Sequence, residues 1–219
     1  RTPIIFIHGV GLDHSIWDSQ INEFDNTVLI YDILGHGKTP LNKNDLSFDD
    51  FSNQILNLMD ELKFNKVHLV GFSIGSLIAR NFASRFNDRL ASLTLLCSIF
   101  NRSDKEQKIV NDRFEQTKKD HKLTKDALKR WFTEDFLNKN PGISDKIFNI
   151  LQNNNMNNFI KIYSLFVKHQ DNEKFENIKT KTLVITGEGD VGSTPEMSIN
   201  LGKKIKNSVV KIIPKGKHL

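Results

Sequence analysis

Short apolar runs alternate with helical patterns along most of this chain, and this alternation restricts its fold more than any other feature. Six apolar runs have the length of buried strands: 4–9, 27–32, 66–72, 92–98, 182–187 and 209–213. Apolar residues recur at helical spacing in three segments between them: 49–64, 73–86 and 194–207. Buried strands that alternate with helices predict an α/β fold with a mostly parallel, doubly wound sheet.

Residues 101–179 break the alternation of strand and helix. They are polar and rich in Asn and Lys, they follow helical patterns, and they contain no convincing strand. A segment of this length is too long for a simple crossover between two strands, so we expect an inserted helical lid. The predicted organisation is an α/β core at 1–100 and 180–219 with a lid (cap) at 101–179.

Composition limits the class of protein. Of the 219 residues 38% are hydrophobic, which is enough for one sizeable core. No apolar run could span a bilayer, no signal-peptide pattern is present, and the single cysteine, Cys97, has no internal partner, so we expect a cytoplasmic protein without membrane contact. The net charge of +5 is spread along the chain, and the six lysines of the last 23 residues have no aromatic residues among them for base stacking, so we expect no nucleic-acid partner.

The stretch HLVGFSIGSLIARNF (68–82) places a Gly-x-Ser-x-Gly pentapeptide between a strand and a helix. Gly71 and Gly75 flank Ser73 at the spacing of a nucleophile elbow, a strained turn that exposes a hydroxyl at the carboxyl edge of the sheet. A tight turn that needs only small residues would have the same pattern. The apolar strand before the turn and the helix after it favour the chemical interpretation, in which Ser73 is a catalytic nucleophile.

A nucleophilic serine needs a base that accepts its proton and an acid that orients the base. His218 follows the last predicted strand and Asp190 follows the strand before it, so both fall at the same sheet edge as Ser73. The order Ser73, Asp190, His218 along the chain is typical of triads on this kind of sheet. Glu188 is the alternative acid and would serve if its loop turned differently.

The tetrahedral intermediate of acyl transfer also needs hydrogen-bond donors for its oxyanion. The sequence offers the backbone amide of Ile74, directly after the nucleophile, and that of Val10 in the segment HGVG. For His8, in the same segment, a structural role is favoured over that of a second base. Two interpretations stay open for His36: it borders the site, or it holds a purely structural turn.

A resemblance to the α/β-hydrolase superfamily rests on five segments: HGVG, DILGHGKT, GFSIG, GEGD and GKHL. They resemble the branch of carboxylesterases, enol-lactone hydrolases, perhydrolase-type esterases and carbon–carbon bond hydrolases, and they cover all of the chain except the lid. The resemblance implies Ser73 as nucleophile, Asp190 as acid and His218 as base. Compared with the family, the sequence begins at the third strand, ends one residue after the base, and has Thr39 where Ser is common.

The lid is expected to set the choice of substrate. Its apolar residues divide between packing onto the core and lining a pocket, and we expect Trp131 and Phe159 in the pocket. Its 16 basic and 12 acidic side chains argue against a highly charged substrate but do not exclude one Arg or Lys beside a carboxylate. No cluster of His, Asp and Glu has metal-ligand spacing and no phosphate or dinucleotide motif is present, so we predict no metal and no cofactor.

These features favour a serine hydrolase that cleaves a small ester, lactone or thioester through an acyl-enzyme on Ser73, with that small molecule as its partner. Two alternatives stay open. The same triad also suits carbon–carbon bond hydrolysis or perhydrolysis, and a non-catalytic ligand-binding receptor can have the same fold.

Overall fold

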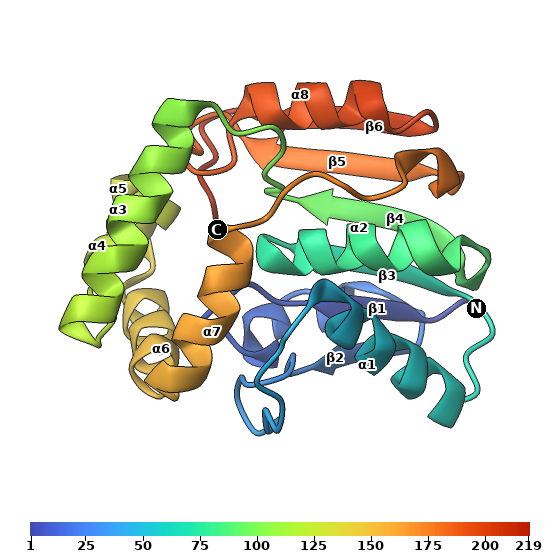
Figure 1. Ribbon diagram of the computed structural model, residues 1–219, viewed down its shortest axis with the longest axis horizontal. Coiled ribbons are helices and arrows are strands. Elements are labelled where there is room, and N and C mark those ends of the chain that lie inside the picture. Colours follow the sequence, from blue (N-terminus) through green and yellow to red (C-terminus); the bar gives the residue numbers. More distant parts are fainter.

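Six parallel strands form one sheet. In the computed structural model, which describes residues 1–219, their order is β2-β1-β3-β4-β5-β6 (Figure 1). The strands are β1 (Ile4–Ile7), β2 (Val28–Tyr31), β3 (Val67–Phe72), β4 (Leu90–Leu96), β5 (Thr182–Gly187) and β6 (Ser208–Ile213). Because the chain adds β2 on one side of β1 and then β3 to β6 on the other, the sheet is doubly wound. The predicted α/β fold class is confirmed.

The helices of the core begin at sequence signals for helix starts. They are α1 (Phe48–Glu61), α2 (Ile74–Phe86) and α8 (Pro195–Lys204). Ser47 and Asp50 form a capping box at the start of α1, and α8 begins with Pro195 after the N-cap Thr194. The fourth strand ends at Leu96, two residues earlier than expected, because Cys97 has a left-handed backbone with φ 51° and cannot extend the strand.

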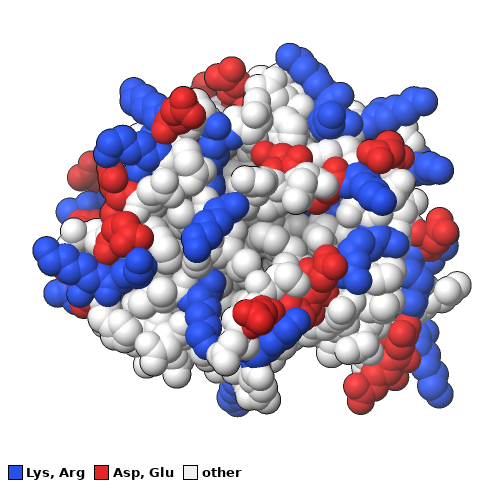
Figure 2. All heavy atoms as spheres, viewed as in Figure 1, with Lys and Arg blue, Asp and Glu red and all other residues white.

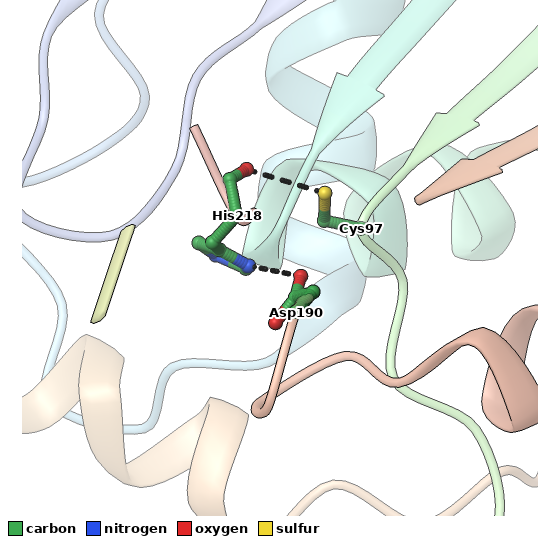
Figure 3. A group of neighbouring side chains, drawn as sticks. All are labelled: Cys97, Asp190 and His218. Carbon is green, nitrogen blue, oxygen red and sulfur yellow. Dashed lines mark hydrogen bonds and ion pairs between the residues drawn. The ribbon is translucent and has the colours of Figure 1, made fainter. Parts of the chain in front are cut away.

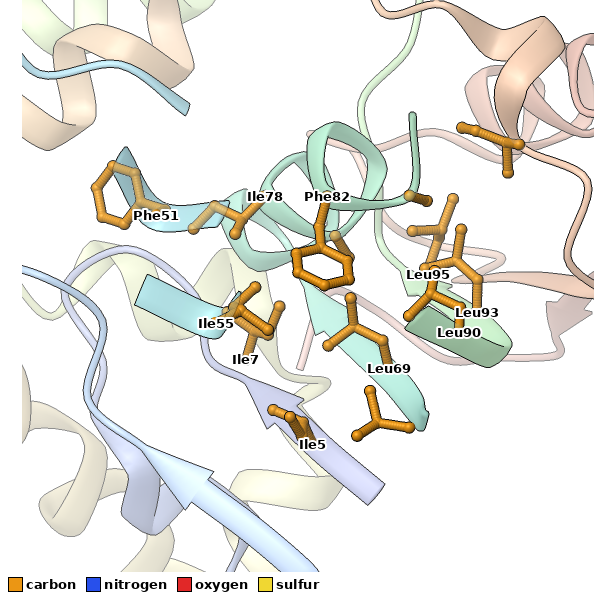
Figure 4. Packing of buried hydrophobic residues seen from close by; sticks show 14 of the residues in the cluster. Ile5, Ile7, Phe51, Ile55, Leu69, Ile78, Phe82, Leu90, Leu93 and Leu95 are labelled. Atoms are coloured by element: carbon orange, nitrogen blue, oxygen red, sulfur yellow. The ribbon is translucent and has the colours of Figure 1, made fainter. Parts of the chain in front are cut away.

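The main hydrophobic core lies between the sheet and the helices α1, α2 and α8. Strand residues that alternate along the pleat point to this face and meet apolar residues of α1 and α2 (Figure 4): Ile5, Ile7, Leu69, Leu93 and Leu95 from the strands, and Phe51, Ile55, Ile78 and Phe82 from the helices. On the opposite face, Trp17 of the 3₁₀ helix η1 (His14–Trp17) packs on Phe6, with 4.8 Å between ring centroids.

Five helices lie between β4 and β5 in the chain: α3 (Asp104–Asp120), α4 (Asp126–Trp131), α5 (Glu134–Lys139), α6 (Pro141–Gln152) and α7 (Met156–Val167). We call them the inserted helices. As expected, no strand interrupts residues 101–179. The arrows of β4 and β5 in Figure 1 point toward the side of the molecule where these helices gather.

The order of the strands marks one place at the carboxyl edge of the sheet. The chain leaves β1 toward β2 and later leaves β3 toward β4, so the loops after β1 and β3 separate in opposite directions. Ligands of open α/β sheets bind in the crevice at such a switch point. Residues 8–11 follow β1 and Ser73 follows β3, so both segments identified in the sequence lie there.

Candidate active site

Ser73 occupies the turn between β3 and α2. Its backbone has φ 56° and ψ −119°, a conformation that costs a residue other than glycine about 1 to 3 kcal/mol. A Cβ atom on Gly71 would overlap the carbonyl oxygen of Gly75, and a Cβ atom on Gly75 would overlap that of Ile7. Both glycines are therefore required by close backbone approach, and the strained turn between them aims the Ser73 side chain away from the sheet.

The side chains of Ser73, Asp190 and His218 meet at this edge. Nδ1 of His218 donates a hydrogen bond of 2.6 Å to Oδ2 of Asp190, and Nε2 of His218 lies 3.3 Å from Oγ of Ser73. Figure 3 shows the Asp190 and His218 side chains pointing toward one another. A carboxylate only accepts hydrogen bonds, so Nδ1 carries a proton, and in the neutral ring Nε2 accepts from the Ser73 hydroxyl.

The surroundings of Asp190 and His218 shift the pKa of each. Oδ1 of Asp190 accepts hydrogen bonds from the backbone N–H groups of Gly192 and Ser193, at 2.8 and 2.9 Å. Burial raises the pKa of Asp190, but the bond from His218 and these N–H groups outweigh burial and hold the pKa below its usual range. Burial lowers the pKa of His218, but the hydrogen bond to Asp190 and the neighbouring Cys97 together outweigh burial, and the pKa lies above its ordinary value. The ring is thus a strong proton acceptor with a fixed orientation.

Glu188, the alternative acid, does not reach the imidazole. It is exposed, and its carboxylate accepts a hydrogen bond of 3.0 Å from the backbone N–H of Lys215. This contact supports the loop that leads to His218. The geometry therefore pairs His218 with Asp190 and gives Glu188 a place in the loop behind it.

The two amides predicted to bind an oxyanion lie in segments that touch. Ile74 is the first residue of α2, where a backbone N–H has no acceptor within the helix. The N–H of Val10 also donates no hydrogen bond within the protein. A Cβ atom on Gly75 would lie 2.7 Å from the carbonyl oxygen of His8, which shows how closely the two segments approach. Both amides are free to donate to a ligand beside Ser73.

Two buried histidines hold the loop that carries Val10. Nε2 of His8 accepts from the N–H of Ile33 at 3.1 Å, and Nε2 of His36 accepts from the N–H of Gly11 at 2.8 Å. Their Nδ1 atoms also bond to backbone carbonyls. Burial lowers the pKa of His8 to about 4 and that of His36 to about 3, so both rings are neutral at pH 7. His8 has the structural role that was favoured, and the open question about His36 is answered in the same way.

A cavity of about 330 Å³ opens onto Ser73 and His218, and the inserted helices form much of its wall. Trp131 and Phe159, the two predicted pocket residues, both line it. The Trp131 and His218 rings have centroids 6.2 Å apart. The backbone carbonyl of Trp131 also accepts a 3.0 Å hydrogen bond from the N–H of Leu219, which ties α4 to the end of the His218 loop.

Cys97 contacts the site in a way that its sequence position does not reveal. Its Sγ donates a hydrogen bond of 3.2 Å to the backbone carbonyl of His218 (Figure 3). Cys97 is 6% exposed and follows the end of β4, beside the strand that leads to Asp190. Nothing in the sequence marks Cys97 for this role, because the partner is a backbone atom of a distant loop.

A second group of titratable side chains, His169, Asp171 and Glu173, lies outside the cavity wall. Nη2 of Arg80, from α2, donates to Asp171 at 2.6 Å and to Glu173 at 2.8 Å. The guanidinium neutralises these carboxylates as a cation would. We therefore interpret the group as a buried ion-pair network that joins α2 to the segment after α7.

A doubly wound parallel sheet, with a serine in a strained turn after β3 and an Asp and a His in the loops after β5 and β6, is the arrangement of an α/β hydrolase. The family model described as alpha/beta hydrolase fold matches residues 2–219, so the chain belongs to this family. The resemblance stated from the sequence is confirmed. None of the helices combines the length and the apolar character that crossing a membrane requires.

Several relatives match nearly the whole chain. An (E)-2-((N-methylformamido)methylene)succinate hydrolase from Acinetobacter baylyi is 28% identical over 221 residues, which are 99% of this chain and 83% of the relative. The 3-oxoadipate enol-lactonase 1 of the same organism is 26% identical over 195 residues, 87% of this chain and 72% of the relative. A solved esterase from Exiguobacterium antarcticum has a TM-score of 0.89 at 18% identity, covering 100% of this chain and 85% of that one. One of the two relatives matched by sequence is named as a hydrolase and the other as an enol-lactonase, and the solved structure shows the same fold.

Proposed function

We propose that this chain is a serine hydrolase that cleaves a small ester, lactone or thioester through an acyl-enzyme on Ser73. One observation carries the proposal: Oγ of Ser73, the His218 ring and the Asp190 carboxylate form a continuous relay, 3.3 and 2.6 Å long, at the wall of a cavity. The hydrolase names of the relatives support the reaction class, and the enol-lactonase among them supports the substrate class.

Acylation follows from this geometry. Oγ of Ser73 attacks the carbonyl carbon of the substrate while its proton passes to Nε2 of His218. Asp190 stabilises the imidazolium that forms. The carbonyl oxygen becomes an oxyanion and accepts hydrogen bonds from the amides of Val10 and Ile74. When the intermediate collapses, the bond to the leaving oxygen or sulfur breaks, His218 returns its proton to that atom, and the acyl group stays on Ser73.

Deacylation repeats these steps with water as the nucleophile. His218 accepts a proton from water, and the resulting hydroxide oxygen attacks the acyl carbon under the same two amides. Collapse of the second intermediate breaks the bond to Oγ, and the proton on His218 restores the Ser73 hydroxyl. The carboxylic acid product then leaves, and every proton in the cycle has passed through His218.

The organisation into two parts belongs to the same proposal. The core, residues 1–100 and 180–219, supplies the nucleophile, the base, the acid and the amides. Residues 101–179 act as a lid, because the side chains that face these groups across the cavity come from the inserted helices. The core thus performs the reaction and the lid encloses the substrate.

Labelling with a fluorophosphonate tests the nucleophile. The reagent should form one adduct, which peptide mass spectrometry places on Ser73, and Ser73→Ala should abolish labelling and lower the turnover of p-nitrophenyl esters by about 10⁴-fold or more. Ser19→Ala, which removes an exposed serine, is the matched control and should change neither readout.

Labelling of a different serine, or turnover that survives in the Ser73→Ala variant, would contradict the proposal. A single acylation of Ser73 without further turnover would instead support the ligand-binding receptor. Turnover of carbon–carbon bond or perhydrolysis substrates, with no turnover of esters, lactones or thioesters, would keep the triad and change the reaction.

A further inference from the structure

Three arginines line the same cavity as Ser73 and His218: Arg102, Arg113 and Arg130. Arg113 lies on α3, Arg130 lies on α4, and Arg102 precedes α3. All three side chains are partly withdrawn from solvent. A guanidinium that loses water is unfavourable unless it gains other acceptors, so the partners of each arginine decide what it can do.

Arg113 and Arg130 have few partners within the protein. No carboxylate oxygen lies within 4.0 Å of the guanidinium nitrogens of either residue. Arg130 donates one hydrogen bond, of 3.1 Å, to the backbone carbonyl of Asp126 in its own helix, and Arg113 lies beside the hydroxyl of the buried Tyr163. Most of the N–H donors of the two groups therefore have no protein acceptor.

The two guanidinium groups also repel one another. The pKa of Arg130 lies below its ordinary value, first because of burial and then because of the positive charge of Arg113. Two like charges at a half-buried wall raise the free energy of the empty cavity. An anion between them would remove this repulsion and would use the free donors.

The acidic side chains of the cavity supply only part of that negative charge, because Asp126 raises the pKa of Arg130 by less than burial and Arg113 lower it. Asp120 and Asp126 are exposed, so water and salt screen their charges. Each acidic residue of the wall accepts hydrogen bonds from a group other than the arginines: Asp190 from His218, Glu106 from Ser103, Asp120 from Gln116 and Asp126 from Thr124. The uncompensated charge at the half-buried part of the wall is therefore positive.

Arg102 differs from the other two arginines because it has structural partners. Its Nη1 donates to the carbonyl oxygens of Phe166 and Val167, each at 3.1 Å, and its guanidinium lies 4.6 Å from the centroid of the Phe166 ring. These contacts satisfy carbonyls at the C-terminal end of α7. Figure 2 shows basic and acidic side chains interspersed on the visible face, so no positive patch stands out on that face.

We propose that Arg113 and Arg130 bind a carboxylate of the substrate, separate from the acyl group that Ser73 attacks. The substrate is then a half-ester, or a carboxylate-bearing lactone, of a dicarboxylic acid. Guanidinium groups match the two oxygens of a carboxylate in geometry and charge. This inference rests on the proposed function, because it names the substrate class of the same site.

The test compares two esters that differ only in the distant charge. One is mono-p-nitrophenyl adipate, with a free carboxylate, and the other is its methyl ester, with that carboxylate blocked. The wild-type protein should favour the free carboxylate in kcat/KM by about tenfold or more. Arg113→Gln and Arg130→Gln should each lower this preference by about tenfold, so that the two esters react about equally, and Arg113→Lys should retain more of it.

Two lysines provide matched controls. Lys108 on α3 and Lys129 on α4 are exposed and lie outside the cavity wall. Lys108→Gln and Lys129→Gln remove the same charge from the same helices and should leave the preference unchanged. Thermal melts of every variant establish that the protein is folded, and titration calorimetry with free adipate measures binding without hydrolysis.

The outcomes separate this inference from the proposed function. If both esters are hydrolysed and the preference is the same in the wild type and the two Arg→Gln variants, the carboxylate site is wrong while the serine hydrolase stands. If neither ester is hydrolysed but adipate binds, and binding weakens at least about tenfold in Arg113→Gln and Arg130→Gln, the carboxylate site stands and the hydrolase proposal is wrong.

Discussion

The reacting side chains of the proposed site are far apart in the sequence, and each is held by its own local structure. The strained turn between two required glycines fixes Ser73. Asp190 is fixed by backbone N–H groups of its own loop, and the backbone carbonyl of His218 accepts from Cys97. Because backbone contacts hold these loops, a change of one reacting side chain should alter the chemistry more than the fold.

Asp190→Asn tests the proposed acid. The amide cannot hold the same tautomer of His218 or stabilise its imidazolium, so kcat should fall by about 10³- to 10⁴-fold. The reaction requires neutral His218, so kcat/KM falls as the pH drops through the pKa of this residue. Asp190 raises that pKa. In the wild-type protein, the pH at which kcat/KM falls on the acid side of its pH–rate profile should therefore lie above the ordinary pKa of histidine. In Asp190→Asn this pH should be lower. A pH–rate profile with a p-nitrophenyl ester measures both effects.

Glu188→Gln is the matched control for the acid. This residue belongs to the same loop, and the hydrogen bond of its carboxylate goes to the backbone N–H of Lys215. Its substitution should change kcat by less than about threefold and should leave unchanged the pH at which kcat/KM falls on the acid side of the pH–rate profile. A large loss in Glu188→Gln together with a nearly silent Asp190→Asn would show that Glu188 is the acid.

At the scale of elements, the sheet could be predicted because its strands are short apolar runs. The candidate site could be predicted because Ser73, Asp190 and His218 each follow one of those runs. The inserted helices could be predicted as helical but not oriented. Arg113 lies in the cavity wall while Lys108 on the same helix is exposed, and charge alone does not distinguish them. That distinction depends on how α3 packs against α7, which involves contacts distant in sequence.

Substitutions on the inserted helices test their role in specificity. Trp131→Ala and Phe159→Ala each remove an aromatic side chain from the cavity wall. Each should change the ratio of kcat/KM between short and long acyl chains. The change should correspond to a free-energy difference of about 1 to 3 kcal/mol, the usual contribution of an apolar pocket. A chain-length series of p-nitrophenyl esters measures this ratio, and thermal melts check folding.

Phe136→Ala is the control for these variants, because Phe136 lies on α5, is 38% exposed and does not line the cavity. It should leave the ratio unchanged. If the ratio stays flat in both cavity variants while substitutions in the core change it, the inserted helices are only a cover and the core sets specificity.

At the scale of the whole molecule, one buried side chain connects the core to both ends of the inserted segment. Arg80 of α2 is 0% exposed and donates to the carbonyl oxygen of Ile99 at 2.8 Å, where the chain leaves the core. It also donates to Asp171 and Glu173, where the chain returns. Asp171 in turn accepts a 2.7 Å hydrogen bond from the N–H of Asn101, so the two ends are joined to one another as well.

Arg80→Met should therefore destabilise the whole chain. Removing one member of a buried ion-pair network leaves the carboxylates of Asp171 and Glu173 without their partner, which lowers the free energy of unfolding by about 3 to 5 kcal/mol. Urea unfolding at pH 7 measures this difference. Arg85→Met on the same helix is the control, because Arg85 is a partly exposed residue in a surface ion pair, and its loss should amount to about 1 kcal/mol or less.

The pH dependence of this difference distinguishes the charge of Arg80 from its packing. Burial raises the pKa of Asp171, but the His169 ring, whose Nε2 lies 3.4 Å from the carboxylate, and the charge and hydrogen bond of Arg80 outweigh burial and hold the pKa well below its usual range. A depressed pKa stabilises the folded protein above the pKa of the unfolded chain, about 4 for Asp, and this stabilisation is lost as the pH falls toward the folded value. The difference in the free energy of unfolding between wild type and Arg80→Met should therefore become smaller below about pH 4. If this difference in free energy stays constant from pH 7 to below about pH 4, Arg80 stabilises the protein by packing and not by its charge.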